Sequence, residues 1–126
     1  MEIESLIKTI IQCAYNVRMH LAAGFLEAVY QKALVIELKE KGIDAETEAP
    51  INVYYKNIVV GEFRADIIVE KKIIIELKAV QNLTPIHETQ LVNYLTATNT
   101  DHGLLINFGG ERIEIKRKFR EYKHKE

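Results

Sequence analysis

The segment that decides the fold runs from Phe63 to Val80 and reads FRADIIVEKKIIIELKAV. Two runs of β-branched and other apolar residues flank a charged turn at residues 70–72, and this pattern predicts a β-hairpin. Residues 73–75 are three consecutive isoleucines. Such a run is typical of a strand that is covered on both faces.

Three charged side chains lie inside the predicted strands of this hairpin. Asp66 is on the first strand, and Glu76 and Lys78 are on the second. Because side chains alternate between the two faces of a strand, Glu76 and Lys78 point the same way. We therefore expect both charges at the end of a buried strand.

This placement of charge has an energetic consequence. Removing an ion from water costs several kcal/mol unless the ion is paired. One lysine neutralises one carboxylate, and two carboxylates about 4 Å apart repel by roughly 4 kcal/mol at an effective dielectric constant of about 20. Three outcomes stay open: one carboxyl group is protonated, the cluster is solvated, or a cation completes it. A hard divalent ion held by carboxylate oxygens would be such a cation.

The composition limits the class of protein. A chain of 126 residues is one domain, residues 1–126, that can bury about two-thirds of its unfolded surface. A net charge of -1 gives no general attraction to nucleic acid. The single cysteine, Cys13, excludes an intrachain disulfide framework and a multi-cysteine zinc site. With neither a signal peptide nor an apolar run near the roughly 18 residues of a membrane span, we expect a cytoplasmic protein.

The rest of the chain alternates between helical and extended patterns. Apolar spacing predicts helices over residues 2–21, 25–41 and 85–98, and strands over residues 46–55, 58–69, 73–78, 104–108 and 112–116. Thr84 and Pro85 suit the start of the third helix. The order α-α-β-β-β-α-β-β predicts an α/β fold with a mixed central sheet flanked by helices, the third helix being the crossover.

Two further features have ordinary local interpretations. Glu27 falls in the first turn of the second helix, where a carboxylate complements the helix dipole. Residues 112–126 hold seven Lys or Arg against three Glu. This basic tail is either a solvated end or an edge that attracts phosphate. No P-loop, dinucleotide-binding glycine motif or GxSxG motif is present, which argues against common NTPases, dehydrogenases and serine hydrolases.

The hairpin resembles the PD-(D/E)XK nuclease superfamily, in which an acid on a bent strand is followed on the next strand by (D/E)-x-K. Asp66 is the first acid, and residues 76–78 supply the second acid and the lysine, while Gln90 follows on a helix. A narrower resemblance, to the GxxExxY proteins, covers residues 24–30, 63–66, 76–78, 90–95 and 103–109 in order. Ala65 stands where the superfamily consensus has proline, a residue that shapes the backbone and bears no chemistry.

The resemblance implies a restriction-endonuclease-like fold and a metal-dependent active site. Asp66 and Glu76 would ligate Mg²⁺ or Mn²⁺, with Glu27 as an additional acid on the metal. Lys78 would orient or deprotonate the attacking water or stabilise the negative charge that develops on the phosphorane, and Gln90 would orient the lysine or the water. Such a cluster serves phosphodiester hydrolysis because the ion activates water and offsets phosphate charge.

The same resemblance implies contacts with substrate. Tyr30, Arg64 and Tyr94 would line the cleft, and Arg64 could bind phosphate. The substrate would be nucleic acid, DNA in preference to RNA. Because a domain of this size covers little nucleic acid, we consider a homodimer as well.

Two other functions stay open at this stage. The fold could serve as a catalytically silent module that binds nucleic acid or a protein. Alternatively, the charged cluster could be a structural ion-pair network in a domain that works by oligomerising.

Overall fold

The computed structural model describes residues 1–121 of the chain. Its elements are α1 (Ile3–His20), α2 (Glu27–Glu40), β1 (Ala45–Tyr55), β2 (Ile58–Val69), β3 (Ile73–Lys78), α3 (Pro85–Thr98), β4 (His102–Asn107) and β5 (Glu114–Phe119). The strands form one sheet in the order β1-β2-β3-β4-β5, in which only β3 and β4 are parallel neighbours. The predicted order of elements and the mixed α/β sheet are confirmed.

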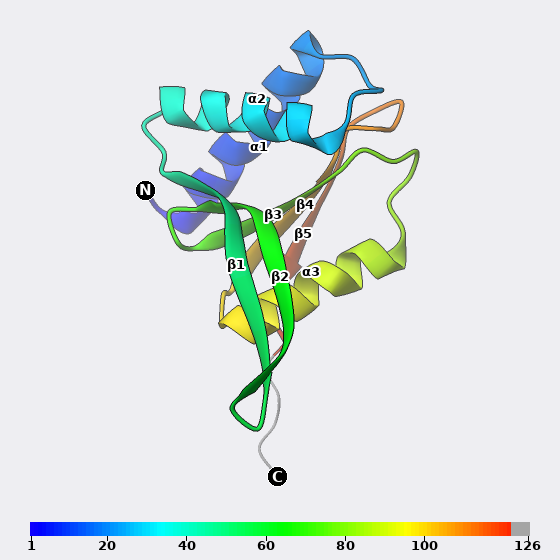
Figure 1. Cartoon of the computed structure of the whole chain (residues 1–126). Helices are drawn as coiled ribbons and strands as arrows, with labels where there is room; N and C mark the ends of the chain where they lie inside the picture. The colour runs from blue at the N-terminus through cyan, green and yellow to red at the C-terminus, as the bar shows by residue number, and fades with distance from the viewer. Residues whose placement is uncertain (122–126) are drawn as a thin grey trace.

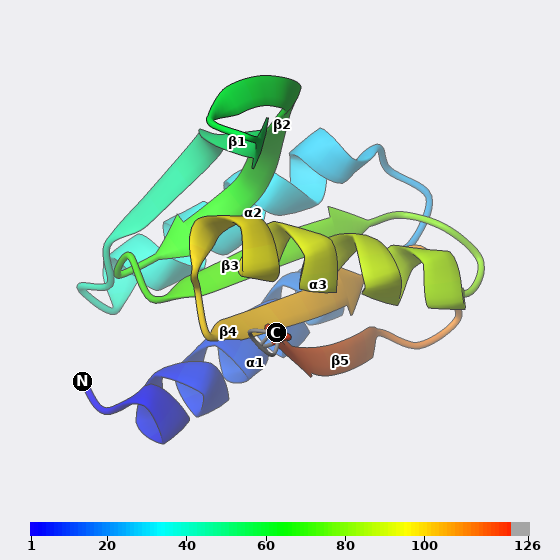
Figure 2. The ribbon, with the colours of Figure 1, turned by 90° about the horizontal axis from the view of Figure 1, so that it is seen from below.

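Two helical layers cover the sheet. Helices α1 and α2 lie on one side and α3 lies on the other (Figures 1 and 2). The apolar stripe of α1, which includes Leu6, Ile10 and Val17, is buried in the larger core with Leu34 and Leu38 of α2. Strand β3 is therefore covered on both faces, as its isoleucine run predicted.

Helix α3 makes the crossover between the parallel strands β3 and β4. It begins where predicted, with Pro85 in its first turn, and the ring nitrogen Nδ1 of His87 accepts a hydrogen bond of 3.1 Å from the backbone N–H of Thr84. Leu91 and Leu95 pack in a second core on the opposite face of the sheet from α1 and α2. A parallel pair cannot be joined by a tight turn, so this helix is required by the topology.

The long β1–β2 hairpin changes its buried face part of the way along. By simple alternation Ala65 and Ile67 would share a face, yet Ala65 packs in the core under α3 and Ile67 in the core under α1 and α2. The ladder lacks the pair between Glu48 and Asp66, although the pairs on both sides of it are present, and Glu48 has a φ of 53°. The irregularity turns the hairpin from one helical layer to the other, and Asp66 lies at the turning point.

The last strand begins later than predicted. The sequence predicted it over residues 112–116 after a tight turn at Gly109 and Gly110, but β5 starts at Glu114. The buried side chain of Asn107 explains the difference, because its Oδ1 accepts hydrogen bonds of 3.0 Å from the N–H groups of Val80 and Gly109. Its Nδ2 donates to the Val80 carbonyl and to Glu114 Oε1, both at 2.9 Å. The chain after β4 is thus drawn over the loop after β3 instead of closing a two-residue hairpin.

The basic tail is largely paired where the structure describes it. Arg117 forms an ion pair of 2.7 Å with Glu4, Lys118 one of 3.1 Å with Glu88, and Arg120 one of 2.7 Å with Asp101. Residues 122–126, which include two of the tail's lysines, lie outside the described residues. The pairing weakens the interpretation of β5 as an edge that attracts phosphate.

None of the helices within residues 1–121 has the length and apolar character needed to cross a membrane.

The close approach of the two loops gives a first prediction. A Cβ atom added at Gly109 would collide with the backbone of Ala79 and Val80, whereas one at Gly103 would meet only side-chain ends of Leu91 and Leu95. We expect Gly109→Ala to lower the free energy of unfolding in urea by about 3 kcal/mol, because backbone cannot move aside. The matched variant Gly103→Ala should cost about 1 kcal/mol, and equal losses in both variants would contradict this account.

Candidate functional site

Asp66 and Glu76 meet where the ladder between β2 and β3 stops. The two strands pair only from Ile67–Ile75 to Val69–Ile73. Beyond that point side chains replace the ladder, since the N–H of Leu77 donates to Asp66 Oδ2 at 2.8 Å and the N–H of Asp66 donates to Glu76 Oε1 at 3.3 Å. The predicted acidic pair is therefore real, and each carboxylate accepts a backbone hydrogen bond from the opposite strand.

Burial and mutual repulsion change the ionisation of this pair. Glu76 is only 6% exposed, and burial, followed by the charge of Asp66, raises its pKa to about 8. Burial also raises the pKa of Asp66, while the hydrogen bond from the Leu77 N–H opposes that rise. Near neutral pH the pair therefore holds a proton that a cation could displace.

Lys78 and Glu27 complete the charged group. The ammonium of Lys78 lowers the pKa values of Glu27, Asp66 and Glu76, so it lies within electrostatic range of all three. Glu27, in the first turn of α2, is exposed as a residue, but protein atoms around its carboxyl group raise its pKa, and Asp66 adds to that rise. Glu27 therefore lies within electrostatic range of Lys78 and Asp66, and its role as an additional acid stays a prediction.

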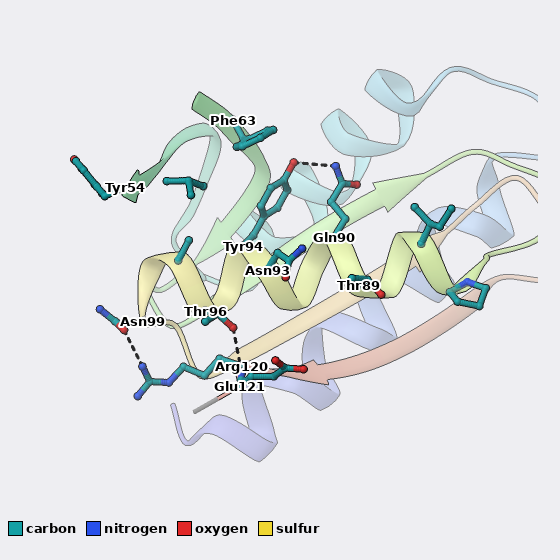
Figure 3. Close-up of a pocket in the computed structure, with 14 residues that line it drawn as sticks. Tyr54, Phe63, Thr89, Gln90, Asn93, Tyr94, Thr96, Asn99, Arg120 and Glu121 are labelled. Atoms are coloured by element: carbon teal, nitrogen blue, oxygen red, sulfur yellow. Dashed lines mark hydrogen bonds between the residues drawn. The ribbon is translucent and has the colours of Figure 1, made fainter. Parts of the chain in front are cut away.

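Helix α3 contributes two neighbouring polar side chains. Gln90 Nε2 donates a hydrogen bond of 3.0 Å to the hydroxyl of Tyr94, as Figure 3 shows. Burial and the nearby charge of Glu76 raise the pKa of Tyr94. Gln90 therefore contacts the tyrosine directly, and the tyrosine connects α3 electrostatically to the acidic pair.

The prediction that Tyr30 contacts substrate is wrong. Its side chain is fully buried, with its ring stacked on Phe108 at a centroid distance of 4.7 Å. Its hydroxyl donates to the Ala22 carbonyl at 2.6 Å and accepts from the Phe25 N–H at 3.2 Å. Tyr30 instead stabilises the loop that precedes α2 through these two hydrogen bonds. Glu27 is the first residue of that helix, so the loop helps to position it.

Arg64 lies on the exposed outer part of the hairpin, two residues before Asp66. It lines a shallow hollow of about 420 Å³ together with Asn52, Glu62 and others, apart from the carboxylate pair. A role in binding phosphate stays a prediction.

Three site residues were missed by the sequence analysis. Gln31 Nε2 donates a 2.8 Å hydrogen bond to the backbone carbonyl of Asp66, Glu48 raises the pKa of Asp66, and His87 lowers that of Glu27. These residues come from α2, β1 and α3. No local pattern could have revealed them, because only the packing of three elements brings them together.

The carboxylate oxygens of this site are the kind of ligand that a hard divalent ion prefers, but among the described residues only two such side chains lie together. Nowhere in the part of the chain that the structure describes do three or more His, Cys, Asp or Glu side chains converge closely enough to hold a metal. Mg²⁺ is commonly bound through one or two carboxylates with water and substrate phosphate, so the pair formed by Asp66 and Glu76 matches the kind of donor set that this ion uses. Within residues 1–121 neither carboxylate has a lysine or arginine in ion-pair contact.

The fold and the cross-strand acidic pair define a restriction-endonuclease-like domain. A family model of the PD-(D/E)XK nuclease superfamily matches residues 4–118. The chain belongs to this superfamily, whose members are generally nucleases.

Comparison with solved structures supports the fold. The crystal structure of SSO0001 is similar at a TM-score of 0.55 and 24% sequence identity, over 76% of this chain and 50% of that one. At this identity the likeness concerns the fold alone, and the matched region spans about half of SSO0001. No curated protein matched the chain.

The raised pKa of Glu76 predicts how stability depends on pH without divalent ions. Because the folded state binds the proton more tightly than the unfolded state, the contribution of Glu76 to stability is fully present below about pH 4.5 and is lost as the pH rises toward about 8. We expect a loss of about 2–4 kcal/mol across this window, measured by urea denaturation in EDTA.

Glu76→Gln should remove most of this dependence, since glutamine does not titrate. The matched variant Glu62→Gln changes the same charge at an exposed position of β2 and should leave the dependence intact. An unchanged pH dependence in Glu76→Gln would show that another group is responsible.

Proposed function

We propose that this protein is a divalent-metal-dependent nuclease that hydrolyses phosphodiester bonds of nucleic acid. The observation that carries the proposal is the pair of carboxylates at the end of the β2–β3 ladder, buried and repelling, with Lys78 two residues beyond the second acid. A structural role would be better served by apolar residues or a closed ion pair. Two buried carboxylates are instead expected at a site that binds a metal cation from solution.

Asp66 and Glu76 are the residues that would hold Mg²⁺ or Mn²⁺. Each has one carboxylate oxygen engaged by a backbone N–H, and the proton that the two carboxyl groups share is what a bound cation would displace. The exposed Glu27 would act from α2 as an outer acid that accepts hydrogen bonds from ordered water. When bound, the ion would activate water and offset the charge of the phosphate.

The remaining polar groups act around that centre. Lys78 would stabilise negative charge on the phosphate or orient the attacking water, since its ammonium lies near all three acids. Gln90 would orient water or substrate with help from the Tyr94 hydroxyl, to which it is bound. Arg64, exposed on β2, would bind a phosphate farther along the substrate.

The finer parts of the proposal rest on the resemblance of the sequence motifs. They are membership of the GxxExxY proteins and DNA in preference to RNA as substrate. We also propose a cytoplasmic setting, on grounds of composition. The single cysteine supports a reducing environment.

Metal binding can be tested by thermal unfolding. Millimolar Mn²⁺ or Mg²⁺ should raise the melting temperature, because a ligand at about 100 times its dissociation constant adds about 2.7 kcal/mol of stability. Asp66→Asn and Glu76→Gln should abolish the shift, and each should reduce cleavage of a DNA substrate at least about 100-fold.

Glu62→Gln again serves as the control, and it should keep both the shift and the cleavage. Cleavage that survives both Asp66→Asn and Glu76→Gln would exclude this site as the catalytic centre.

Lys78 distinguishes an enzyme from a silent binding module. Lys78→Met keeps much of the aliphatic stem and removes the charge, so the metal-dependent shift should remain while the cleavage rate falls about 10²–10⁴-fold. The rate is measured with metal and substrate both saturating. If the wild type binds metal and nucleic acid but cleaves neither DNA nor RNA, the catalytically silent module is the better description.

A further inference from the structure

A groove lies beside the acidic site, between the outer part of the β1–β2 hairpin and α3. Its volume is about 1110 Å³. Tyr54 and Phe63 line it from the hairpin, and Gln90, Asn93 and Tyr94 line it from α3 (Figure 3). The acidic motif does not predict this groove. The groove forms because the outer part of the hairpin leaves the sheet and stands opposite α3.

The groove shares a strand and a hydrogen-bonded pair of side chains with the proposed active site. Gln90, proposed to act at the site, lines the groove together with Tyr94, to whose hydroxyl it donates a hydrogen bond of 3.0 Å. Phe63, three residues before Asp66 on the same strand, packs its ring against Tyr94 at a centroid distance of 5.4 Å. A polymer whose backbone passes Asp66 and Glu76 could therefore continue into the groove.

The lining is suited to flat, polar-edged rings. Tyr54 is 60% exposed and Phe63 is 43% exposed, so both rings are accessible to a ligand in the groove. The amides of Gln90 and Asn93 offer donors and acceptors beside those rings. Aromatic faces next to amide groups are how proteins hold unpaired bases, by stacking and by hydrogen bonds to base edges.

The groove has too little positive charge to bind a nucleic-acid duplex through its phosphates. Among the described residues that line it, the charged ones are Arg120 and Glu121, which offset each other. Arg120 also binds Asn99 Oδ1 at 3.0 Å and forms its ion pair with Asp101. A duplex on this face would present two charged backbones to a surface with little positive charge to receive them.

We propose that this groove binds the unpaired bases of a single-stranded nucleic-acid segment, stacked on Tyr54 and Phe63, next to the scissile phosphate. This inference rests on the proposed function and specifies its substrate as single-stranded nucleic acid or a single-stranded extension.

The test is direct binding of labelled oligonucleotides to the full chain in EDTA, followed by fluorescence anisotropy. Three probes of about 12 nucleotides are compared: a single strand, the same sequence as a duplex, and an abasic strand with the same phosphates. The single strand should bind at least about tenfold more tightly than either of the other two, because only it offers free bases.

Two adjacent tyrosines provide matched variants. Tyr54 lines the groove, whereas Tyr55, which is 64% exposed, does not and carries the Lys56 ammonium over its ring. Tyr54→Ala should weaken binding of the single strand about fivefold or more and leave binding of the abasic strand unchanged. Tyr55→Ala should change neither. Both variants remove an exposed ring, so their melting temperatures should match that of the wild type.

Other results would overturn the inference. These are equal affinity for the single and abasic strands, equal losses in the two variants, preference for the duplex, or no binding of any probe.

The outcome is separable from that of the proposed function. Base-dependent binding without cleavage in Mg²⁺ or Mn²⁺ would keep the groove and refute the nuclease. Metal-dependent cleavage that is indifferent to Tyr54→Ala and to the abasic probe would keep the nuclease and refute the groove.

Discussion

The structure depends on one interruption of a β-ladder, where the carboxylates of Asp66 and Glu76 take the place of backbone pairing. Each accepts an N–H from the other strand, so the two acids are held together by the same bonds that end the ladder. Their repulsion and their burial oppose ionisation and raise the pKa of Glu76 to about 8. Such a destabilising arrangement persists only where the surrounding fold over-determines it, and such arrangements gather at functional sites.

The same interruption divides the hairpin between two cores. On the side of Glu48 and Asp66 nearer the tip of the hairpin, Ala49, Ile51 and Ala65 pack in the core under α3. On the other side, Ile67 and Val69 pack in the core under α1 and α2. The two strands continue beyond the body of the domain as an arm, visible in Figure 1. The acidic pair thus lies where three layers meet, and α2 and α3 can both reach it. The groove beside α3 follows from this geometry, because an arm that left the sheet at another residue would not stand opposite that helix.

Membership of the PD-(D/E)XK superfamily accounts for the acidic pair and for the scaffold that holds it. It does not select a substrate, because a fold supports many functions and the side chains around the site decide between them. In this chain the side chains that line the groove come mostly from the arm and from α3. Their aromatic and amide character differs from the cationic surface that a protein uses to hold a duplex by its phosphates.

The sequence by itself determined the order of the elements, the mixed sheet, the crossover helix and the pairing of Asp66 with the Glu76–Lys78 strand. The elements are predictable because hydrophobic periodicity, turn residues and helix caps are local features of the sequence. The arrangement of the acids is predictable because a short turn joins the two strands, so residues close in sequence are close in space. Only the tertiary structure decided that Tyr30 is buried, that β5 starts at Glu114, and that Gln31, Glu48 and His87 surround the acids. The physical reason is that each of these depends on packing between distant segments. Tyr30 is buried because its ring stacks on Phe108, and β5 starts late because Asn107 hydrogen-bonds across two loops. The residues around the acids are brought together by a change of buried face in the hairpin, which the alternation of the sequence does not predict.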